Sequence, residues 1–164
     1  MADFQVYDNF LEQSYFNEIE KLITMHELPW YTSLGVGSET DYIDNIYYQT
    51  HAFFEHYRIY SQQWFDKLMP LINKLDVKAL IRIRANMYPG RENITTHGYH
   101  VDFEYKSKAA LLYINDNDGY TEFEKGGKVE SKANRLVIFN SNDRHRSTNC
   151  TNAYARFNIN LNYF

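Results

Sequence analysis

The spacing of apolar residues changes about midway along the chain. In two stretches of the first half, residues 13–25 and 61–75, apolar positions recur every three or four residues, which is the spacing of one face of an α-helix. The pattern predicts two amphipathic helices, each of which buries one face. The apolar positions are Phe16, Ile19, Leu22 and Ile23 in the first stretch and Trp64, Leu68, Leu71, Ile72 and Leu75 in the second.

From residue 77 onward the apolar period becomes two, as in β-strands. Turn residues separate the runs, including Asn117-Asp118-Gly119 and Lys125-Gly126-Gly127, where glycine tolerates the positive φ of tight hairpins. Upstream, Gly35-Val36-Gly37-Ser38 indicates a loop, and the aromatic and His residues of 47–60 favour extended structure. The predicted architecture is therefore two helices followed by a compact β-sandwich or barrel. The candidate strands are residues 79–88, 98–103, 109–115, 121–124, 128–130, 135–139 and 155–163.

Two of the candidate strands have one apolar and one polar face, because successive side chains point to opposite sides of a sheet. If the apolar faces pack on the helices, the polar faces line one of two places. The first is a barrel interior, where buried Arg and Asn must hold water, ligand or metal; the second is an open, solvated surface. The alternation of side chains between the two faces of a strand does not distinguish the barrel interior from the open surface. The apolar faces are Ile81, Ile83, Ala85 and Met87, and Phe157, Ile159, Leu161 and Tyr163; the polar faces are Arg82, Arg84, Asn86 and Tyr88, and Arg156, Asn158, Asn160 and Asn162.

Composition adds that the chain is one globular unit. Its 164 residues are enough to bury a core without disulfides, and the lone Cys150 has no partner for an internal one. No apolar run approaches the ~20 residues that span a bilayer, and the first residues lack the basic segment of a signal peptide. We expect a single domain over residues 1–164, with a helical support region (1–76) and a catalytic β core (77–164), no membrane partner and a cytosolic location.

The net charge of −4 is unevenly distributed. Residues 1–76 contain 4 Lys or Arg and 12 Asp or Glu, a balance of −8, whereas residues 77–164 contain 13 and 9, a balance of +4. A basic C-terminal half indicates that an anion is bound there, although an uneven solvated surface explains the charge equally well.

The motif His100-Val101-Asp102 carries the most specific chemistry. On an extended segment its imidazole and carboxylate project from the same side, so both can reach one ion. A single His-x-Asp is common by chance, but His145 follows Asp102 by 43 residues, after a predicted strand, and Arg156 follows eleven residues later. Two His and one carboxylate form the facial triad of non-haem Fe(II) oxygenases. The Arg156 guanidinium offers two parallel N–H donors, which suits a carboxylate.

In this order the residues resemble the HxD…H…R motif of the Fe(II)/2-oxoglutarate-dependent oxygenases. Within them the chain is most similar to the prolyl hydroxylases, both the collagen type and those acting on hypoxia-inducible factor. The resemblance covers about residues 78–164 and implies a double-stranded β-helix, the jelly-roll form of the predicted barrel, packed against the N-terminal helices. Further matching segments are Met87-Tyr88-Pro89-Gly90, Leu112-Tyr113-Ile114-Asn115, Gly119-Tyr120-Thr121-Glu122-Phe123 and Asn134-Arg135-Leu136-Val137-Ile138-Phe139.

The resemblance also implies roles for individual residues. Arg156 and Tyr113 would hold the distal carboxylate of 2-oxoglutarate, and Tyr88 would line the pocket beside the metal. Taken singly, these tyrosines are more often core aromatics, because the chain has 15 Tyr to distribute. The implied iron ligands are His100, Asp102 and His145.

The implied function is a hydroxylase that couples O₂ activation to decarboxylation of 2-oxoglutarate to succinate. Fe(II) would be the cofactor, 2-oxoglutarate and O₂ the cosubstrates, and a prolyl residue in a peptide or protein the substrate. Three alternatives stay open: a nucleic-acid or nucleotide oxygenase, a small-molecule hydroxylase, and a non-catalytic jelly-roll binding module. The basic C-terminal half favours the first of these, but the second Arg of the demethylase Arg/Asn strand is absent from residues 156–162.

Several other positions carry weaker expectations. Residues 91–97 form a longer loop than in the prolyl hydroxylases, so this segment and residues 35–44 are candidate covers of the site. His97 should point away from the metal, because its offset from His100 is odd. The composition is typical of a compact microbial or phage-encoded enzyme. The candidate substrate contacts are Arg82, Arg84 and Arg144; His26 is read as a helix-end residue, and His51 and His56 as structural residues.

Overall fold

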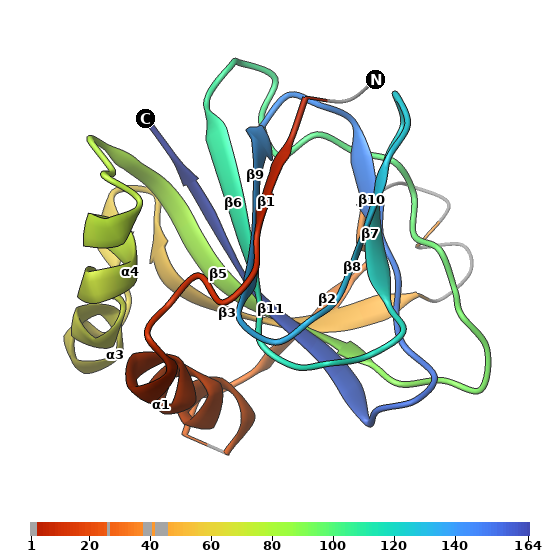
Figure 1. Cartoon of the computed structure of the whole chain (residues 1–164), viewed down its shortest axis with the longest axis horizontal. Helices are drawn as coiled ribbons and strands as arrows, with labels where there is room; N and C mark the ends of the chain where they lie inside the picture. Colours follow the sequence, from red (N-terminus) through yellow and green to blue (C-terminus); the bar gives the residue numbers. More distant parts are fainter. Residues whose placement is uncertain (1–2, 26, 38–40, 42–45) are drawn as a thin grey trace.

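Two antiparallel β-sheets face each other in the computed structural model, which describes residues 3–25, 27–37, 41 and 46–164. Helices cover the outer side of the larger sheet, and the smaller sheet lies on its other side (Figure 1). The predicted mainly-β jelly roll with flanking helices is confirmed. In spatial order, the larger sheet contains β1 (Gln5–Tyr7), β9 (Arg135–Asn140), β6 (Lys108–Tyr113), β11 (Ala155–Tyr163), β5 (Leu80–Pro89), β3 (Tyr47–Glu55) and β2 (Tyr31–Leu34), with β4 (Arg58–Ile59) paired to β3. The smaller sheet contains β10 (His145–Ser147), β7 (Tyr120–Phe123) and β8 (Lys128–Glu130).

The described helices are α1 (Gln13–Thr24), α3 (Gln62–Lys67) and α4 (Met69–Lys74). The prediction for α1 is confirmed to within one residue, whereas the single helix predicted over residues 61–75 is wrong. Pro70 divides it, because proline has no N–H to donate to the carbonyl four residues earlier and its ring clashes with that turn. None of the described helices combines the length and apolar character that a membrane crossing demands.

Six predicted strands are confirmed to within two residues at each end: β5, β6, β7, β8, β9 and β11. Residues 47–60 are extended as predicted, in β3 and β4. The strand predicted at 98–103 is wrong, because only isolated bridges, one of them between His100 and His145, tie this segment to the smaller sheet. The description of residues 1–76 as a helical support region is also wrong, since β1 to β4 belong to the larger sheet and β3 pairs with β5 along its length.

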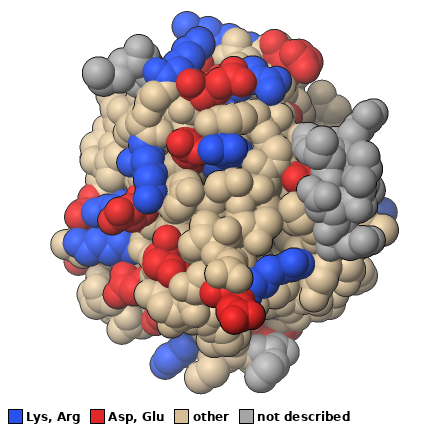
Figure 2. All heavy atoms as spheres, turned by 90° about the vertical axis from the view of Figure 1, so that its right-hand side faces the viewer, with Lys and Arg blue, Asp and Glu red and all other residues tan. Residues whose placement is uncertain are grey.

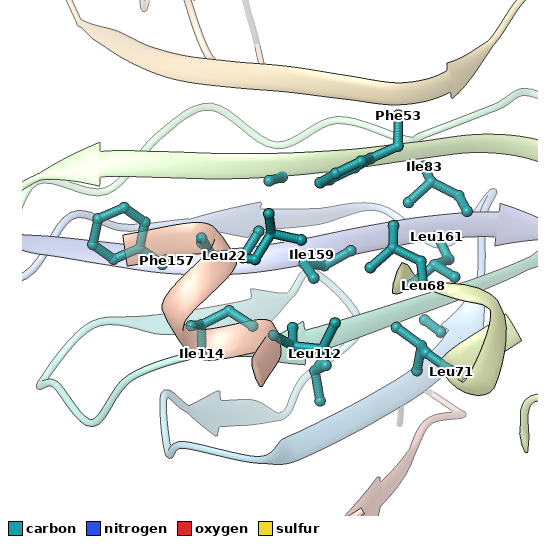
Figure 3. Close-up of a cluster of buried hydrophobic side chains, with 14 of the residues drawn as sticks. Leu22, Phe53, Leu68, Leu71, Ile83, Leu112, Ile114, Phe157, Ile159 and Leu161 are labelled. Atoms are coloured by element: carbon teal, nitrogen blue, oxygen red, sulfur yellow. The ribbon is translucent and has the colours of Figure 1, made fainter. Parts of the chain in front are cut away.

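The main apolar core lies between the larger sheet and the helices. Figure 3 shows Leu22 of α1 and Leu71 of α4 facing side chains such as Leu112 of β6 and Ile159 of β11. The predicted parity holds along β11. On β5 it fails at one position, because a register shift opposite Tyr163 brings Leu80 rather than Ile81 to the core. A second, smaller cluster fills the space between the sheets, so β6 is buried on both faces.

The polar face of β11 points into the space between the sheets. Arg156, Asn158 and Asn162 expose at most 1% of their surface. The alternative of an open sheet with a solvated polar face is therefore wrong. Buried groups of this kind need hydrogen-bond partners, and the candidate site supplies them.

The glycines of the predicted turns serve different purposes. Gly126 and Gly127 have φ of 96° and 116°, as predicted for a tight hairpin. Gly119 is instead required by a close approach, because a Cβ there would lie 2.4 Å from the Asn149 carbonyl oxygen and 2.6 Å from Cδ of Arg156. The Asn117-Asp118-Gly119 turn thus makes room for the buried arginine.

An ion-pair cluster around Asp8 links the end of β1 to β9. Arg135 donates to both carboxylate oxygens of Asp8, from Nε at 2.6 Å and from Nη2 at 3.1 Å, and Lys132 Nζ lies 3.0 Å away. The hydrogen bonds from Arg135 and Lys132 hold the pKa of Asp8 well below its usual range. Because the folded-state pKa is lowered, the stabilisation is present above the unfolded-state pKa and is lost as the pH falls below it.

We expect Asp8→Asn to lower the free energy of unfolding at pH 6.5 by about 0.5–1 kcal/mol, a small effect because the pair is partly exposed. At pH 3 the difference from the wild type should shrink. Urea denaturation at both pH values measures it, with Asp76→Asn, which removes the more exposed ion pair to Lys78, as the control. An equal difference at both pH values would contradict the assignment.

Candidate metal centre

The side chains of His100, Asp102 and His145 converge on one point. His145 opens β10, and His100 lies opposite it, with two backbone hydrogen bonds of 2.9 Å between the two residues. One potential ligand atom from each of the three side chains lies within 4.8 Å of the others. The histidine ring centroids are 4.5 Å apart. A single ion at this point can contact all three side chains.

The backbone orients both imidazoles. Nδ1 of His145 lies 2.9 Å from the Asp143 carbonyl oxygen, and Nδ1 of His100 lies 3.3 Å from that of Gly98. Donation from Nδ1–H to these carbonyls leaves the Nε2 lone pair of each ring for a metal. Burial, together with the neighbouring His145, lowers the pKa of His100. The His100 ring is therefore held neutral, which is the form that coordinates.

The Asp102 carboxylate is buried and fully ionised. Burial alone would raise its pKa, but the electrostatic interactions with the neighbouring His145, Arg82 and His100 lower it further than burial raises it, to about 2. Arg82 Nη2 donates to Oδ1 at 3.1 Å, and Nδ2 of Asn162 and of Asn160 donate to Oδ2 at 2.7 and 3.2 Å. A carboxylate has about four lone-pair positions, so these donors leave room for a metal.

These contacts assign partners to three residues of the polar strand faces. Arg82 was a candidate substrate contact, but in the structure it is an ion-pair partner of Asp102. Asn160 and Asn162 had no specific role predicted from the sequence. Their position on the polar face of a buried strand was the available signal, and their partner turns out to be the carboxylate of the triad.

A cavity of about 150 Å³ adjoins two of the three donors. It is lined by His100 and Asp102, by Asn160 and Arg84, and by Tyr88, whose ring stacks on that of Tyr48 at 5.5 Å. Tyr88 thus lines the same cavity as His100 and Asp102. Arg84 pairs with Glu55, and Arg144 with Glu124.

Arg156 and Tyr113 are not among the residues that line this cavity. Arg156 lies against Tyr88, which does line it, and Tyr113 lies against Arg156. The Arg156 guanidinium carbon is 5.4 Å from the ring centre of Tyr88 and 5.3 Å from that of Tyr113. Within the described part of the chain Arg156 has no carboxylate partner. Its donors bind Ser131 Oγ at 2.6 Å, Thr121 Oγ1 at 3.0 Å and the Thr148 carbonyl oxygen at 3.1 Å. The Tyr113 hydroxyl donates to the same Thr121 oxygen at 2.9 Å.

Residues 96–103 do not form the regular strand on which the predicted orientation of His97 rested. His97 is buried, its Nδ1 lies 2.7 Å from Ser147 Oγ, and its ring stacks on Tyr88 at 5.2 Å. Burial, with Arg156 as a second cause, lowers the pKa of His97 to about 3. His97 is a neutral support for Tyr88 and is not part of the three-residue donor cluster.

Asp41 of one candidate cover contacts Gly98, which directly follows the other cover and lies two residues before His100. Oδ2 of Asp41 accepts hydrogen bonds from the backbone N–H groups of Val36 and Gly37, and Oδ1 accepts one from Gly98. Val36 also lines the cavity. Residues 38–40 and 42–44 of the predicted cover, and His26, lie outside the described residues. His51 is structural as predicted, since its Nδ1 lies 2.9 Å from the Pro29 carbonyl oxygen.

Comparison with solved structures decides the fold. A prolyl-4-hydroxylase from Pseudomonas putida superposes with a TM-score of 0.66 at 14% identity, over 99% of this chain and 92% of that chain. The chain has the fold of the 2-oxoglutarate- and Fe(II)-dependent oxygenases. A Trichoplax adhaerens prolyl hydroxylase in complex with a hypoxia-inducible-factor peptide gives 0.62 at 17% identity, over 100% and 84%. A 2OG-Fe(II) oxygenase family oxidoreductase from Burkholderia pseudomallei gives 0.68 at 10% identity, over 98% and 84%.

Comparison at the level of sequence finds no family model and no curated protein that matches the chain. The similarity to these oxygenases is therefore one of fold, as expected at identities of 10–17%. Within this oxygenase fold, the donor set of two imidazoles and one carboxylate suits a ferrous ion.

Proposed function

We propose that the chain is a 2-oxoglutarate-dependent Fe(II) hydroxylase that acts on prolyl residues in a peptide or protein. The observation that carries the proposal is the convergence of His100, Asp102 and His145 within 4.8 Å, beside a cavity. When bound, Fe(II) with 2-oxoglutarate and O₂ would supply the oxidation, which releases succinate and CO₂. The proposal treats residues 1–164 as one catalytic domain that works in the cytosol.

The environment of Arg156 supports 2-oxoglutarate as the cosubstrate. A buried guanidinium without a counter-ion is costly, and among the described residues Arg156 has none. An organic diacid with one carboxylate against Arg156 would supply the missing negative charge through charge-assisted hydrogen bonds. Thr121 and the Tyr113 hydroxyl, which already hydrogen-bond to each other, would orient the same carboxylate.

The residues around the metal position would hold the metal, orient its ligands and limit the access of water. His100 and His145 present imidazoles whose Nδ1 atoms lie against backbone carbonyls, and Asp102 presents a carboxylate held by Arg82 and Asn162. These supports keep the donors in place before a metal arrives. Val36 and Tyr48, which line the cavity, would limit the access of water to the oxidant.

A polypeptide substrate is supported by the two prolyl hydroxylases among the structural neighbours, one of which is named as a complex with a peptide. A nucleic-acid substrate is less well supported, because eight of the 13 Lys and Arg residues of the C-terminal half pair with acids. The described pairs include Arg135 with Asp8, Arg144 with Glu124 and Arg146 with Glu122. Figure 2 shows the same mixture of Lys, Arg, Asp and Glu on the face at the right of Figure 1. An anionic polymer would have to displace these partners.

The test uses the wild-type chain in two steps. Anaerobic addition of Fe(II) and then 2-oxoglutarate should produce a visible charge-transfer band, and admission of O₂ with a panel of Pro-containing peptides should release succinate and add one oxygen to a peptide. Absence of the band contradicts the metal and cosubstrate assignment.

The second step separates the rival substrates. Turnover of free amino acids but of no peptide would identify a small-molecule hydroxylase. Salt-sensitive binding of DNA or RNA with oxidation of a base would favour the nucleic-acid alternative. A band without turnover of any substrate would indicate a binding module.

A further inference from the structure

An apolar groove of about 390 Å³ lies next to the metal cavity. Its walls include Tyr57, Ile81, Phe103, Tyr105 and Phe164, and Arg82 lines both the groove and the cavity. Arg82 is the residue that pairs with Asp102. A chain lying in the groove would therefore reach the candidate metal position at the groove's Arg82 end.

The aromatic rings in the groove form a continuous platform. The ring of Phe103 lies 5.3 Å from that of Tyr105, which is stacked on Phe164 at 6.1 Å and 13°. The Arg82 guanidinium carbon lies 5.0 Å from the Phe103 ring centre. Tyr105 and Phe164 remain 48% and 54% exposed, so the platform offers apolar surface to a partner.

The hairpin that carries Tyr57 is strained. His56 and Tyr57 form the two-residue connection between β3 and β4, and their φ angles of 52° and 60° lie in the left-handed region. Asn-Gly is the sequence that such turns favour, because a residue with a bulky side chain adopts a positive φ only at a cost in conformational energy. Tyr57 is also 96% exposed, so its ring contributes almost nothing to the core. A strained backbone that presents an exposed aromatic ring at a groove indicates a role in binding.

The charges around the groove favour a neutral occupant. Of the described side chains that line it, those of Glu55 and Arg82 are the ones that carry full charges, and they pair with Arg84 and Asp102. A phosphate backbone would find no unpaired cation in this lining. An extended polypeptide with prolyl or aliphatic side chains matches the platform, because the polyproline II conformation binds aromatic-lined grooves with little loss of entropy.

We infer that this groove binds the segment of a polypeptide substrate that flanks the residue presented to the metal, and that the segment is extended, uncharged and rich in Pro or aliphatic residues. The inference rests on the proposed function for the role of the bound chain. Binding itself is independent of iron, so the two can fail separately.

The probe is a fluorescein-labelled, uncharged dodecapeptide of alternating Pro and Leu, titrated with the full chain and followed by fluorescence anisotropy. The double variant His56→Asn/Tyr57→Gly removes the ring and relieves the strained turn. Its Kd should rise about tenfold, while its melting temperature stays unchanged or increases. Tyr105→Ala, which leaves the hairpin intact, should weaken binding by a similar factor. The control Tyr154→Ala removes a 72% exposed ring outside the groove and should leave the Kd unchanged.

Three outcomes would overturn the inference. The first is no binding of the peptide by the wild type, and the second is equal affinity in the wild type, the double variant and Tyr105→Ala. The third is tight binding of a twelve-residue oligothymidine that the same substitutions weaken, because this would assign the groove to nucleic acid. The Fe(II)–2-oxoglutarate band is recorded on the same wild-type sample, so that a failure of the proposed function shows as a missing band whatever the peptide does.

Discussion

Asp102→Ala is expected to abolish the Fe(II)–2-oxoglutarate absorption band and to lower succinate release by about a thousandfold, which corresponds to about 4 kcal/mol of transition-state stabilisation. Asp102 supplies the only anionic donor of the described cluster, and the two imidazoles that remain form a much weaker site. Equilibrium dialysis against Fe(II), with the band and the succinate assay, measures the effect.

The substitution also leaves Arg82 buried without its partner, so folding must be checked separately. Asp102→Asn keeps the shape of the side chain while it removes the charge, and it should lose the band with a smaller loss of thermal stability. Asp66→Ala deletes a carboxylate on α3, away from the site, and should keep the band. An undiminished band in Asp102→Ala would remove Asp102 from the metal site.

Arg156→Met is expected to raise the apparent Kd and KM for 2-oxoglutarate by about a hundredfold while Fe(II) still binds. Methionine fills similar space but carries neither the charge nor the N–H donors that would hold a carboxylate. Arg156→Lys keeps the charge without the planar fork, so its KM should fall between those of the wild type and Arg156→Met. The readouts are a titration of the charge-transfer band with 2-oxoglutarate and succinate release as a function of its concentration.

A second readout separates ligand binding from a general effect on folding. A ligand present at about a hundred times its Kd stabilises the folded state by about 2.7 kcal/mol. With a fixed concentration of divalent metal, added 2-oxoglutarate should therefore raise the melting temperature of the wild type but not that of Arg156→Met. An equal rise in both proteins would mean that Arg156 does not contact the cosubstrate.

The local sequence pattern was sufficient to predict a strand where apolar residues repeat on one of its faces. The alternation of Phe157, Ile159 and Leu161 with Asn and Arg predicted both the bounds of β11 and its apolar side. The same approach failed for β1 and β2, which have only three and four residues and are mostly exposed. Such strands form because a neighbouring strand offers hydrogen-bond partners, and that information is not in their own side chains.

The segment around His100 shows a different limit of prediction from the sequence pattern. Its alternating pattern predicted a strand, yet only bridges such as His100 to His145 form, since the chain there wraps the site instead of extending a sheet. His97 therefore turns inward, against Tyr88. The motif was still found, because it depends on residue identity and order and not on regular secondary structure.

The order of residue types along the chain was enough to identify two imidazoles, a carboxylate and a guanidinium as the chemical groups of the site, and the period-two pattern was enough to predict a β-barrel or sandwich. How these groups are held became visible only in the folded arrangement. The tertiary structure placed Arg82 and Asn162 on Asp102, enclosed Arg156 without a carboxylate partner among the described residues, and set an aromatic groove beside Arg82. The physical reason is that hydrogen-bond partners and cavities arise between strands that are distant in sequence, where packing and burial choose among contacts that local periodicity leaves equally possible.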